Sequence, residues 1–167
     1  RNVWLLSFYL AGIRVADVLE TKWEDIQDGR LRYRMNKNQK VVSLKIPDKV
    51  LTILSYYEPY KALNGGYVFP ELKGVDEKDS KAVLAAIRNA NKTLNKYLKR
   101  IAKLAKISKN ITMHISRHTF GNISGDKISV QMLQKLYRHS SITTTVNYQA
   151  NFISKDIDDA LDAVIDF

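Results

Sequence analysis

The chain has 167 residues, of which 45% are hydrophobic and 26% charged, and this excludes a disordered polypeptide and fits one globular domain. Because it contains no cysteine, thiol catalysis, a disulfide framework and a thiolate metal site are excluded. The formal charge of +10 indicates a polyanionic partner, with nucleic acid ahead of an anionic membrane surface and simple solubility as the alternative.

The N-terminal part of the chain predicts short helices. We expect a buried helix over residues 3–11 and a second one in RVADVLE, residues 14–20. The first apolar run is far shorter than the roughly 20 residues that a membrane span needs, so we expect no membrane partner. Thr21 and Glu24 have the spacing of a capping box, which predicts a further helical turn in TKWEDI.

The stretch GRLRYRMNKNQKVVSLKI, residues 29–46, changes to a period of two. Such alternation predicts a β-hairpin, here with a basic outer face and with Lys37 and Lys40 at its tip. The residues expected to face inward are Leu31, Tyr33, Met35, Val42, Leu44 and Ile46.

The middle of the chain predicts a helix over 48–58, a loop over 63–74 and a long helix over 80–107. Residues 81–110 hold nine Lys/Arg and no Asp/Glu. The apolar stripe expected to pack comprises Leu84, Ile87, Leu94, Leu98, Ile101 and Ala105. The opposite stripe, expected to bind DNA unless it is merely a solvated face, comprises Lys92, Lys96, Lys99, Lys103 and Lys106.

The C-terminal part also predicts helices, over 113–124, 130–138, 141–149 and 156–166. The expected N-caps are Ser129 and either Ser140 or Ser141. The whole pattern predicts an α+β fold that is mainly α-helical, with one small antiparallel hairpin or sheet.

Four stretches hold the polar residues that suggest chemistry: GIRVAD, MNKNQK, HISRHTF and HSSITTTVNY. Together they offer a phenol, two guanidinium groups, imidazoles and an ammonium, which suits metal-free chemistry on a phosphodiester. A zinc site formed by His114, His118 and His139 is the alternative, but the two histidine-bearing stretches contain no carboxylate or cysteine to complete it.

In order and spacing these segments resemble the catalytic domain of the tyrosine recombinases, also called phage integrases. The resemblance covers essentially the whole chain and includes GIRVADVL, RHTF and HSSITTT. The residues that match the catalytic pattern of the family are Arg14, Lys37, His114, Arg117, His139 and Tyr148.

Two departures from the family pattern stand out. Family members usually carry Leu-Gly before the second histidine, whereas this chain has Tyr137-Arg138, which either perturbs the loop or adds a phosphate contact through Arg138. The hairpin lysine is commonly followed by threonine, whereas Asn38 follows here, so Lys40 remains an alternative to Lys37 as the acid.

The resemblance implies that Tyr148 attacks the scissile phosphate and forms a 3′-phosphotyrosine, without metal, ATP or another cofactor. It further implies that Arg14 and Arg117 stabilise the transition state, that His114 is the base, that His139 donates to the phosphate and that Lys37 protonates the leaving oxygen. Asp17 and His118 are expected as supporting residues, with His118 buttressing the site from behind.

The resemblance also implies a single catalytic domain over residues 1–167, cut from a longer cytoplasmic protein of bacterial or phage origin whose N-terminal core-binding domain is absent. Its partners would be double-stranded DNA and, in the full-length protein, three further copies in a tetramer on two DNA sites; the isolated domain is compatible with a monomer. The segment 156–167 either docks on its own core or is exchanged between protomers. The alternatives are a non-catalytic DNA-binding module of the same descent and an enzyme like type IB topoisomerases or telomere resolvases.

Overall fold

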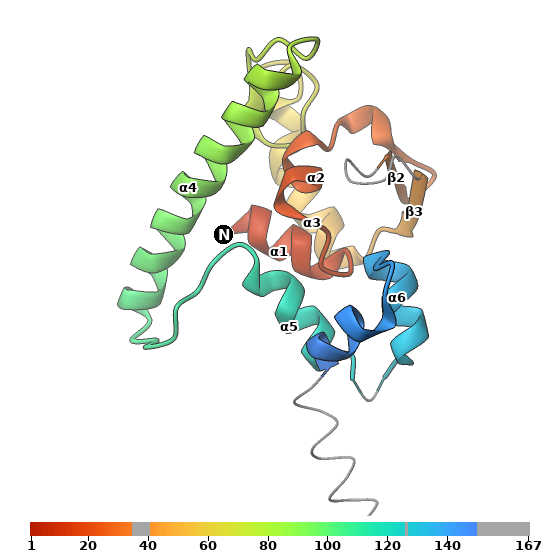
Figure 1. The fold of residues 1–167 in the computed structure, drawn as a ribbon. Coiled ribbons are helices and arrows are strands. Elements are labelled where there is room, and N and C mark those ends of the chain that lie inside the picture. The colour runs from red at the N-terminus through yellow and green to blue at the C-terminus, as the bar shows by residue number, and fades with distance from the viewer. Residues whose placement is uncertain (35–40, 126, 150–167) are drawn as a thin grey trace, which may run out of the picture.

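The computed structural model describes residues 1–34, 41–125 and 127–149 (Figure 1). Its main helices are α1 (Asn2–Tyr9), α2 (Val15–Glu20), α3 (Asp48–Tyr57), α4 (Ser80–Leu104), α5 (Ile115–Ile123) and α6 (Val130–Tyr137), and a last helix covers 142–149. Its strands are β1 (Ile26–Gln27), β2 (Arg30–Arg34) and β3 (Val41–Lys45). The predicted fold class, mainly helical with one small antiparallel sheet, is confirmed.

Helix α1 forms the centre of the fold. In Figure 1 it lies in the middle of the molecule, with α4 along one side, the sheet on the other, and α5 and α6 below. The helix is apolar on most of its surface, and Val3 and Leu6 belong to the single large core cluster of the described residues. The indole of Trp4 donates to the carbonyl oxygen of Thr112 at 3.1 Å, which ties α1 to the segment that leads into α5.

The sheet has three antiparallel strands, one more than the predicted hairpin. The short strand β1 pairs with β2, and β2 pairs with β3 in a register that places Tyr33 opposite Val42. The alternation that predicted β2 is confirmed, since Leu31 and Tyr33 are buried whereas Arg32 is exposed. The two-residue β1 is too short to show a period, which explains why the sequence pattern did not reveal it.

The predicted helical turn after α2 exists, but its predicted cap is wrong. A 3₁₀ turn covers Trp23–Asp25, and the Asp25 carboxylate accepts the backbone N–H of Lys22 at 2.8 Å. The hydroxyl of Thr21 donates instead to the carbonyl oxygen of Asp17 at 2.8 Å. The reciprocal pair therefore starts one residue later than the Thr21–Glu24 spacing predicted.

Helix α4 begins where predicted and ends earlier. The Asp79 carboxylate caps its start by accepting the N–H groups of Lys81 and Ala82. Its buried residues are Ile87, Ala90, Leu98 and Ala102, whereas Leu84 and Ile101, which were predicted to pack, are 53% and 43% exposed. Lys106 lies beyond the end of the helix with φ of 54°, so it does not continue the lysine stripe.

The segment 63–74, predicted as a loop, contributes to the core. It contains a 3₁₀ turn at Pro70–Leu72, and Val68, Phe69 and Leu72 are fully buried. The N–H of Val68 donates to the carbonyl oxygen of Thr21 at 3.0 Å, which attaches the segment to the end of α2. The Gly and Pro content that predicted a loop concealed a short apolar run, VF, between a turn and a proline.

Both predicted serine caps are present at the C-terminal helices. The Ser129 hydroxyl accepts the N–H of Met132 at the start of α6, and the Ser141 hydroxyl accepts the N–H of Thr143. Ser141 is therefore the cap of the last described helix. The predicted hairpin tip with Met35, Lys37 and Lys40 and the predicted helix 156–166 lie outside the described residues.

Among the described residues, no helix combines the length and the apolarity needed to cross a membrane.

Candidate active site

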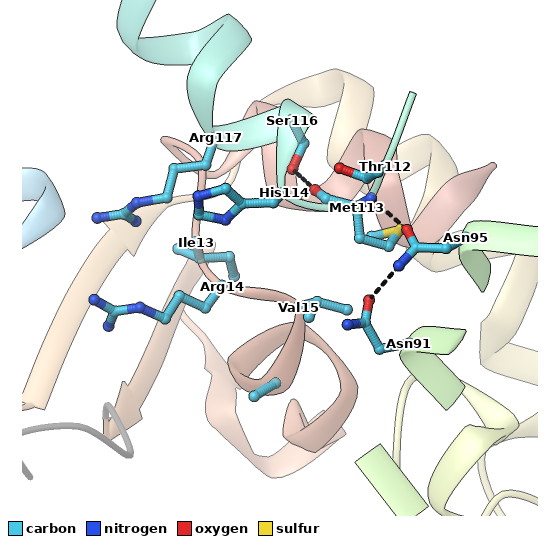
Figure 2. Close-up of a pocket in the computed structure, with 11 residues that line it drawn as sticks. Ile13, Arg14, Val15, Asn91, Asn95, Thr112, Met113, His114, Ser116 and Arg117 are labelled. Carbon is cyan, nitrogen blue, oxygen red and sulfur yellow. Dashed lines mark hydrogen bonds between the residues drawn. The ribbon is translucent and has the colours of Figure 1, made fainter. Parts of the chain in front are cut away.

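Arg14 is presented by a left-handed turn between α1 and α2. Ala11 and Gly12 have φ of 59° and 66°, and Arg14 itself is the N-cap residue of α2. A Cβ at Gly12 would lie 2.9 Å from Cα of Arg117, so glycine allows the turn to approach α5 closely. Figure 2 shows the result, because the side chains of Arg14 and Arg117 extend to the same side with the ring of His114 beside Arg117.

A pair of serines fastens this turn to α5. The hydroxyl of Ser7 donates to the carbonyl oxygen of Ile13 at 2.7 Å and lies 2.7 Å from the hydroxyl of Ser116, and both serines are buried. Since Ile13 precedes Arg14 and Ser116 precedes Arg117, these contacts fix the spacing of the two arginines.

Arg117 is the most constrained cation of the site, with 3% of its surface exposed. Its Nη1 donates to the carbonyl oxygen of Gly12 at 2.8 Å, and its Nη2 donates to that of Tyr137 at 3.0 Å. The guanidinium also lies over the ring of Tyr137, with Cζ 3.6 Å from the ring centroid. Burial lowers the pKa of Arg117, as does the positive charge of Arg14, while Tyr137 and Tyr148 raise it.

His114 stands at the N-cap of α5 and lines a pocket of about 400 Å³ together with Arg14, Arg117, Asn91 and Asn95. The side-chain oxygen of Asn95 accepts the N–H of Met113 at 2.7 Å, so α4 positions the backbone just before His114 (Figure 2). Burial lowers the pKa of His114, and the positive charges of His118, Arg117 and Arg14 lower it further. At neutral pH its imidazole is therefore neutral and able to accept a proton.

His139 is held between Arg117 and Thr145. Its Nε2 lies 3.3 Å from Nη2 of Arg117, and its Nδ1 lies 3.0 Å from the hydroxyl of Thr145, a fully buried residue. Because a guanidinium only donates, the hydrogen bond with Arg117 requires Nε2 to accept. Nδ1 then carries the proton and donates to the Thr145 oxygen.

Tyr148 lies inside this group of side chains. Its ring stacks on that of His118 with centroids 4.5 Å apart, and it lies 5.3 Å from the ring of His139. Cζ of Arg117 lies 5.8 Å from the centroid of its ring. Tyr148 also packs against Gly121 of α5, three residues after His118, where a Cβ would lie only 2.9 Å from the Tyr148 Cβ.

The structure places His118 beside the candidate nucleophile. Its side chain is exposed, lies edge-to-face with His114 at 4.7 Å, and stacks on Tyr148, so it stands on the same face as the candidate nucleophile. The reason is the helical spacing, since positions i and i+4 of α5 share one face. Burial lowers the pKa of His118, and the charge of Arg117 lowers it further.

The departure at Tyr137-Arg138 leaves the loop backbone in a glycine-like conformation. Arg138 ends α6 with φ of 52° and ψ of 44°, the left-handed region that glycine adopts without strain. The N–H of His139 still donates to the carbonyl oxygen of Gln134 at 3.2 Å. Arg138 thus keeps the backbone conformation that a glycine would favour at this position, and the structure shows no disruption of the loop by the arginine.

Asp17 is buried in the first turn of α2 and faces a different hollow from the pocket that holds Arg14. This hollow also contains Tyr33, whose pKa is raised first by burial and then by the negative charge of Asp17. The charges of Arg117, Arg138 and Arg14 act on Tyr33 in the opposite direction. The end of β2 thus lies within electrostatic reach of the arginines.

Most of the residues predicted to carry the chemistry are brought together within the described part of the chain. Arg14 and His114 line one pocket with Arg117, and the rings of His139 and Tyr148 surround the same guanidinium, while Lys37 lies outside the described residues. Sequence reasoning missed Tyr137, Thr145 and Asn95 as contacts of these residues. For Thr145 a signal existed, because it stands three residues before Tyr148 and therefore on the same face of the last helix.

The part of the chain that is described contains no group of three or more His, Asp or Glu side chains arranged to hold a metal ion. The two histidines of α5 lie edge-to-face, and His139 is engaged by Arg117 and Thr145. The zinc alternative therefore has no described ligand set.

The lysine stripe of α4 adjoins the site. Lys92, Lys96 and Lys99 line a surface hollow of about 850 Å³, which shares Asn91 and Asn95 with the pocket of Arg14 and His114. Lys103 is also exposed on α4. Within the described ranges, no ion pair joins an acidic side chain to these lysines.

Comparison with known proteins gives a consistent set of relatives. The sequence profile described as the phage integrase family matches residues 2–154. A "tyrosine recombinase" of Thermosipho africanus is 28% identical over 143 residues, which are 84% of this chain and 46% of the relative. The chain spans about half the length of the curated relatives it matches.

Solved structures share the fold. The site-specific recombinase XerH, in a post-cleavage complex with its palindromic difH substrate, superimposes with a TM-score of 0.68 at 18% identity over 96% of this chain and 44% of that one. A lambda integrase tetramer bound to a Holliday junction gives a TM-score of 0.59 at 19% identity over 89% of this chain and 41% of that one. At these identities the likeness shows the fold alone.

Proposed function

The chain belongs to the phage integrase family, and from this premise we propose that it breaks and rejoins DNA strands at specific sites through a covalent phosphotyrosine on Tyr148, without metal or ATP. The observation that carries the proposal is the placement of the Tyr148 ring beside the guanidinium of Arg117 and between two imidazoles. A phenol beside a buried cation is a nucleophile next to a site for an anionic phosphate.

In the proposed reaction the Tyr148 oxygen forms a bond to phosphorus while the bond to the 5′-oxygen breaks, which leaves a 3′-phosphotyrosine and a 5′-hydroxyl. Arg14 and Arg117 would bind the non-bridging oxygens, whose charge grows in the transition state. Losing either guanidinium should slow cleavage by about 100- to 1,000-fold. Rejoining is the reverse attack by a 5′-hydroxyl, so the phosphodiester energy is retained.

For the proton of Tyr148 we propose His114 as the acceptor, supported by its lowered pKa. His118, which stacks on the Tyr148 ring, would hold the phenol in place rather than lie behind the site. His139 would donate to the phosphate, and this requires a proton on Nε2, which in the present arrangement accepts from Arg117. Negative charge arriving with the phosphate would favour that protonation.

Lys37 is proposed as the acid that protonates the leaving 5′-oxygen, with Lys40 as the alternative. Support comes from its match to the family pattern, and Lys37 itself lies outside the described residues. Asp17, which lines a separate hollow in the turn of α2 that follows Arg14, would be a supporting group through its place next to that turn.

Double-stranded DNA is the proposed substrate. Lys92, Lys96, Lys99 and Lys103 would hold its phosphates along α4, and the hollow they line leads to the pocket of Arg14 and His114. Arg138 beside His139 offers a further cation, and Lys106 would contribute from outside the helix. For the whole protein we propose a tetramer on two duplexes, with residues 1–167 as its catalytic domain; the lambda integrase neighbour is a tetramer bound to a Holliday junction.

No observation favours a non-catalytic DNA-binding module. The feature that suggested it was Tyr137-Arg138, and Arg138 adopts the left-handed conformation that a glycine would adopt there. The topoisomerase-like alternative differs from recombination in outcome, since it reseals a strand to its original partner. Transfer of a labelled strand between two duplexes separates the two.

The proposal is tested with nicked duplexes drawn from the DNA that flanks the coding gene, in the presence of EDTA. The expected result is a covalent protein–DNA adduct on a denaturing gel that Tyr148→Phe does not form. Tyr97→Phe, at an exposed tyrosine of α4, is the matched control and should form the adduct normally. An adduct that persists in Tyr148→Phe, or one that requires added Mg²⁺, would contradict the proposal.

A further inference from the structure

Tyr137, a buried residue outside the predicted catalytic set, contacts both the guanidinium and the main chain of Arg117. Its ring lies against the guanidinium, and its carbonyl oxygen accepts from Nη2. Its hydroxyl donates to the main-chain carbonyl oxygen of Arg117 in a short hydrogen bond. Tyr137 is fully buried, so these contacts are shielded from water.

Two glycines leave the space for this tyrosine. A Cβ at Gly12, or one at Gly121, would lie 3.1 Å from the Tyr137 hydroxyl. Gly12 precedes Arg14 by two residues, and Gly121 packs against Tyr148. The hydroxyl of Tyr137 therefore sits where the turn before Arg14, helix α5 and the candidate nucleophile meet.

The same ring touches two further residues proposed for the chemistry. It meets Tyr148 edge-to-face with centroids 5.0 Å apart and His139 in the same manner at 5.3 Å. Hydrogen bonds to Gly12 and to the carbonyl of Tyr137 fix the guanidinium within its own plane. The ring of Tyr137 packs against the face of the guanidinium and so limits its movement out of that plane, which the in-plane hydrogen bonds do not prevent.

We propose that Tyr137 is a positioning residue that sets the plane of the Arg117 guanidinium and the lateral place of Tyr148, so that cleavage depends on an aromatic ring at position 137. This inference rests on the proposed function. Leucine, usual in the family at this position, has no face to offer a cation, and here it would leave the space beside Gly12 and Gly121 unfilled. This chain thus holds Arg117 with an aromatic ring at a position where the family usually has leucine.

The experiment compares Tyr137→Phe, which keeps the ring, with Tyr137→Leu and Tyr137→Met, which remove it. The first readout is the NMR signal of the Arg117 side-chain N–H groups, which the ring current of Tyr137 shifts upfield; Arg117→Lys assigns it. The shift should persist in Tyr137→Phe and disappear in both aliphatic variants. This readout needs no DNA and no activity.

The second readout is the single-turnover rate of adduct formation on the nicked duplex. We expect Tyr137→Phe to stay within about threefold of the wild type and the aliphatic variants to fall by about 10- to 30-fold, with duplex affinity unchanged. In an Arg117→Ala background the aliphatic substitutions should have no further effect, because the residue they position is gone.

Several outcomes would overturn the inference. The first is an unshifted Arg117 signal in the wild type, and the second is a wild-type rate of adduct formation in the aliphatic variants. The third is that the aliphatic substitutions lower the rate as much in the Arg117→Ala background as in the wild type, which would assign Tyr137 to general packing. If Tyr137→Leu does not fold, Tyr137→Met carries the comparison, and thermal melts identify that case. Absence of any adduct from the wild-type protein would instead count against the proposed function, and the NMR readout would still decide how Arg117 is held.

Discussion

At the scale of single residues, the site keeps two neighbouring imidazoles uncharged. The pKa of His114 and that of His118 are lowered from the usual 6.5, in both cases mainly by burial and then by nearby positive charge. The unfolded chain therefore binds these protons at a higher pH than the folded one. Stability from this source is present above pH 6.5 and is lost as the pH falls through the lowered folded-state values.

The first prediction concerns these two titrations. In the free protein the NMR midpoints of His114 and His118 should both lie below 6.5, and the free energy of unfolding in urea should fall as the pH drops beneath that value. His118→Gln should raise the midpoint of His114, because it removes a positive neighbour. Midpoints at or above 6.5, or a His114 midpoint that ignores the substitution, would contradict this account.

The residue scale also shows what the sequence could reveal. The resemblance to the tyrosine recombinases implied a common site for Arg14, Arg117 and Tyr148, and the structure brings these side chains close together. The contacts of Tyr137 could not be predicted, since they depend on how three helices pack around one guanidinium, whereas the three-residue spacing of Thr145 and Tyr148 on the last helix did offer a signal. His118 follows Arg117 directly in the sequence, but its spacing of four residues from His114 is what places it beside that ring and against Tyr148.

At the scale of elements, Gly121 in α5 is where the last helix meets the core. Alanine normally stabilises a helix by about 1 kcal/mol relative to glycine. Here the added Cβ would lie 2.9 Å from the Cβ of the half-buried Tyr148 and 3.1 Å from the hydroxyl of the fully buried Tyr137. Overpacking of this kind costs about 1–3 kcal/mol, so the clash should exceed the gain in propensity.

The second prediction is that Gly121→Ala destabilises the protein by roughly 1 kcal/mol in urea and slows adduct formation more than it weakens DNA binding. The control is Ser55→Ala, an exposed position of α3 where the gain in helix propensity meets no clash. A Gly121→Ala protein that is more stable and equally active would mean that Tyr148 does not dock against α5 when it reacts.

The elements differ in how much of them the sequence could predict. Long periodic segments such as α4 were identified well, and the cap at Ser129 was placed correctly. The inward face of α4 was predicted less well, because the core does not cover this face toward the two ends of the helix, where Leu84 and Ile101 are exposed. Strand β1 and the buried run at Val68 are too short for a period to appear, and tertiary pairing alone defines them.

At the scale of the whole molecule, the positively charged lysines of α4 lie next to the pocket that holds Arg14 and Arg117. The hollow lined by Lys92, Lys96 and Lys99 shares Asn91 and Asn95 with the pocket of the two arginines, so a polyanion lying along α4 reaches the site without leaving a cationic surface. Each lysine that contacts a phosphate releases condensed counterions, and the logarithm of the binding constant then changes by about −0.9 per contact for each unit of log salt.

The third prediction follows from this salt dependence per phosphate contact. Lys92→Ala/Lys96→Ala should reduce the magnitude of the salt slope for duplex binding by about 2, measured by fluorescence anisotropy at several salt concentrations. The matched control is Lys61→Ala/Lys78→Ala, which removes the same charge from exposed positions outside α4. If binding depended only on net charge, both pairs would change the slope equally, and α4 would have no special place in the path of the DNA. A change confined to the α4 pair would instead place the duplex along the helix whose asparagines border the pocket of Arg14 and His114, which would couple binding to the chemistry proposed there.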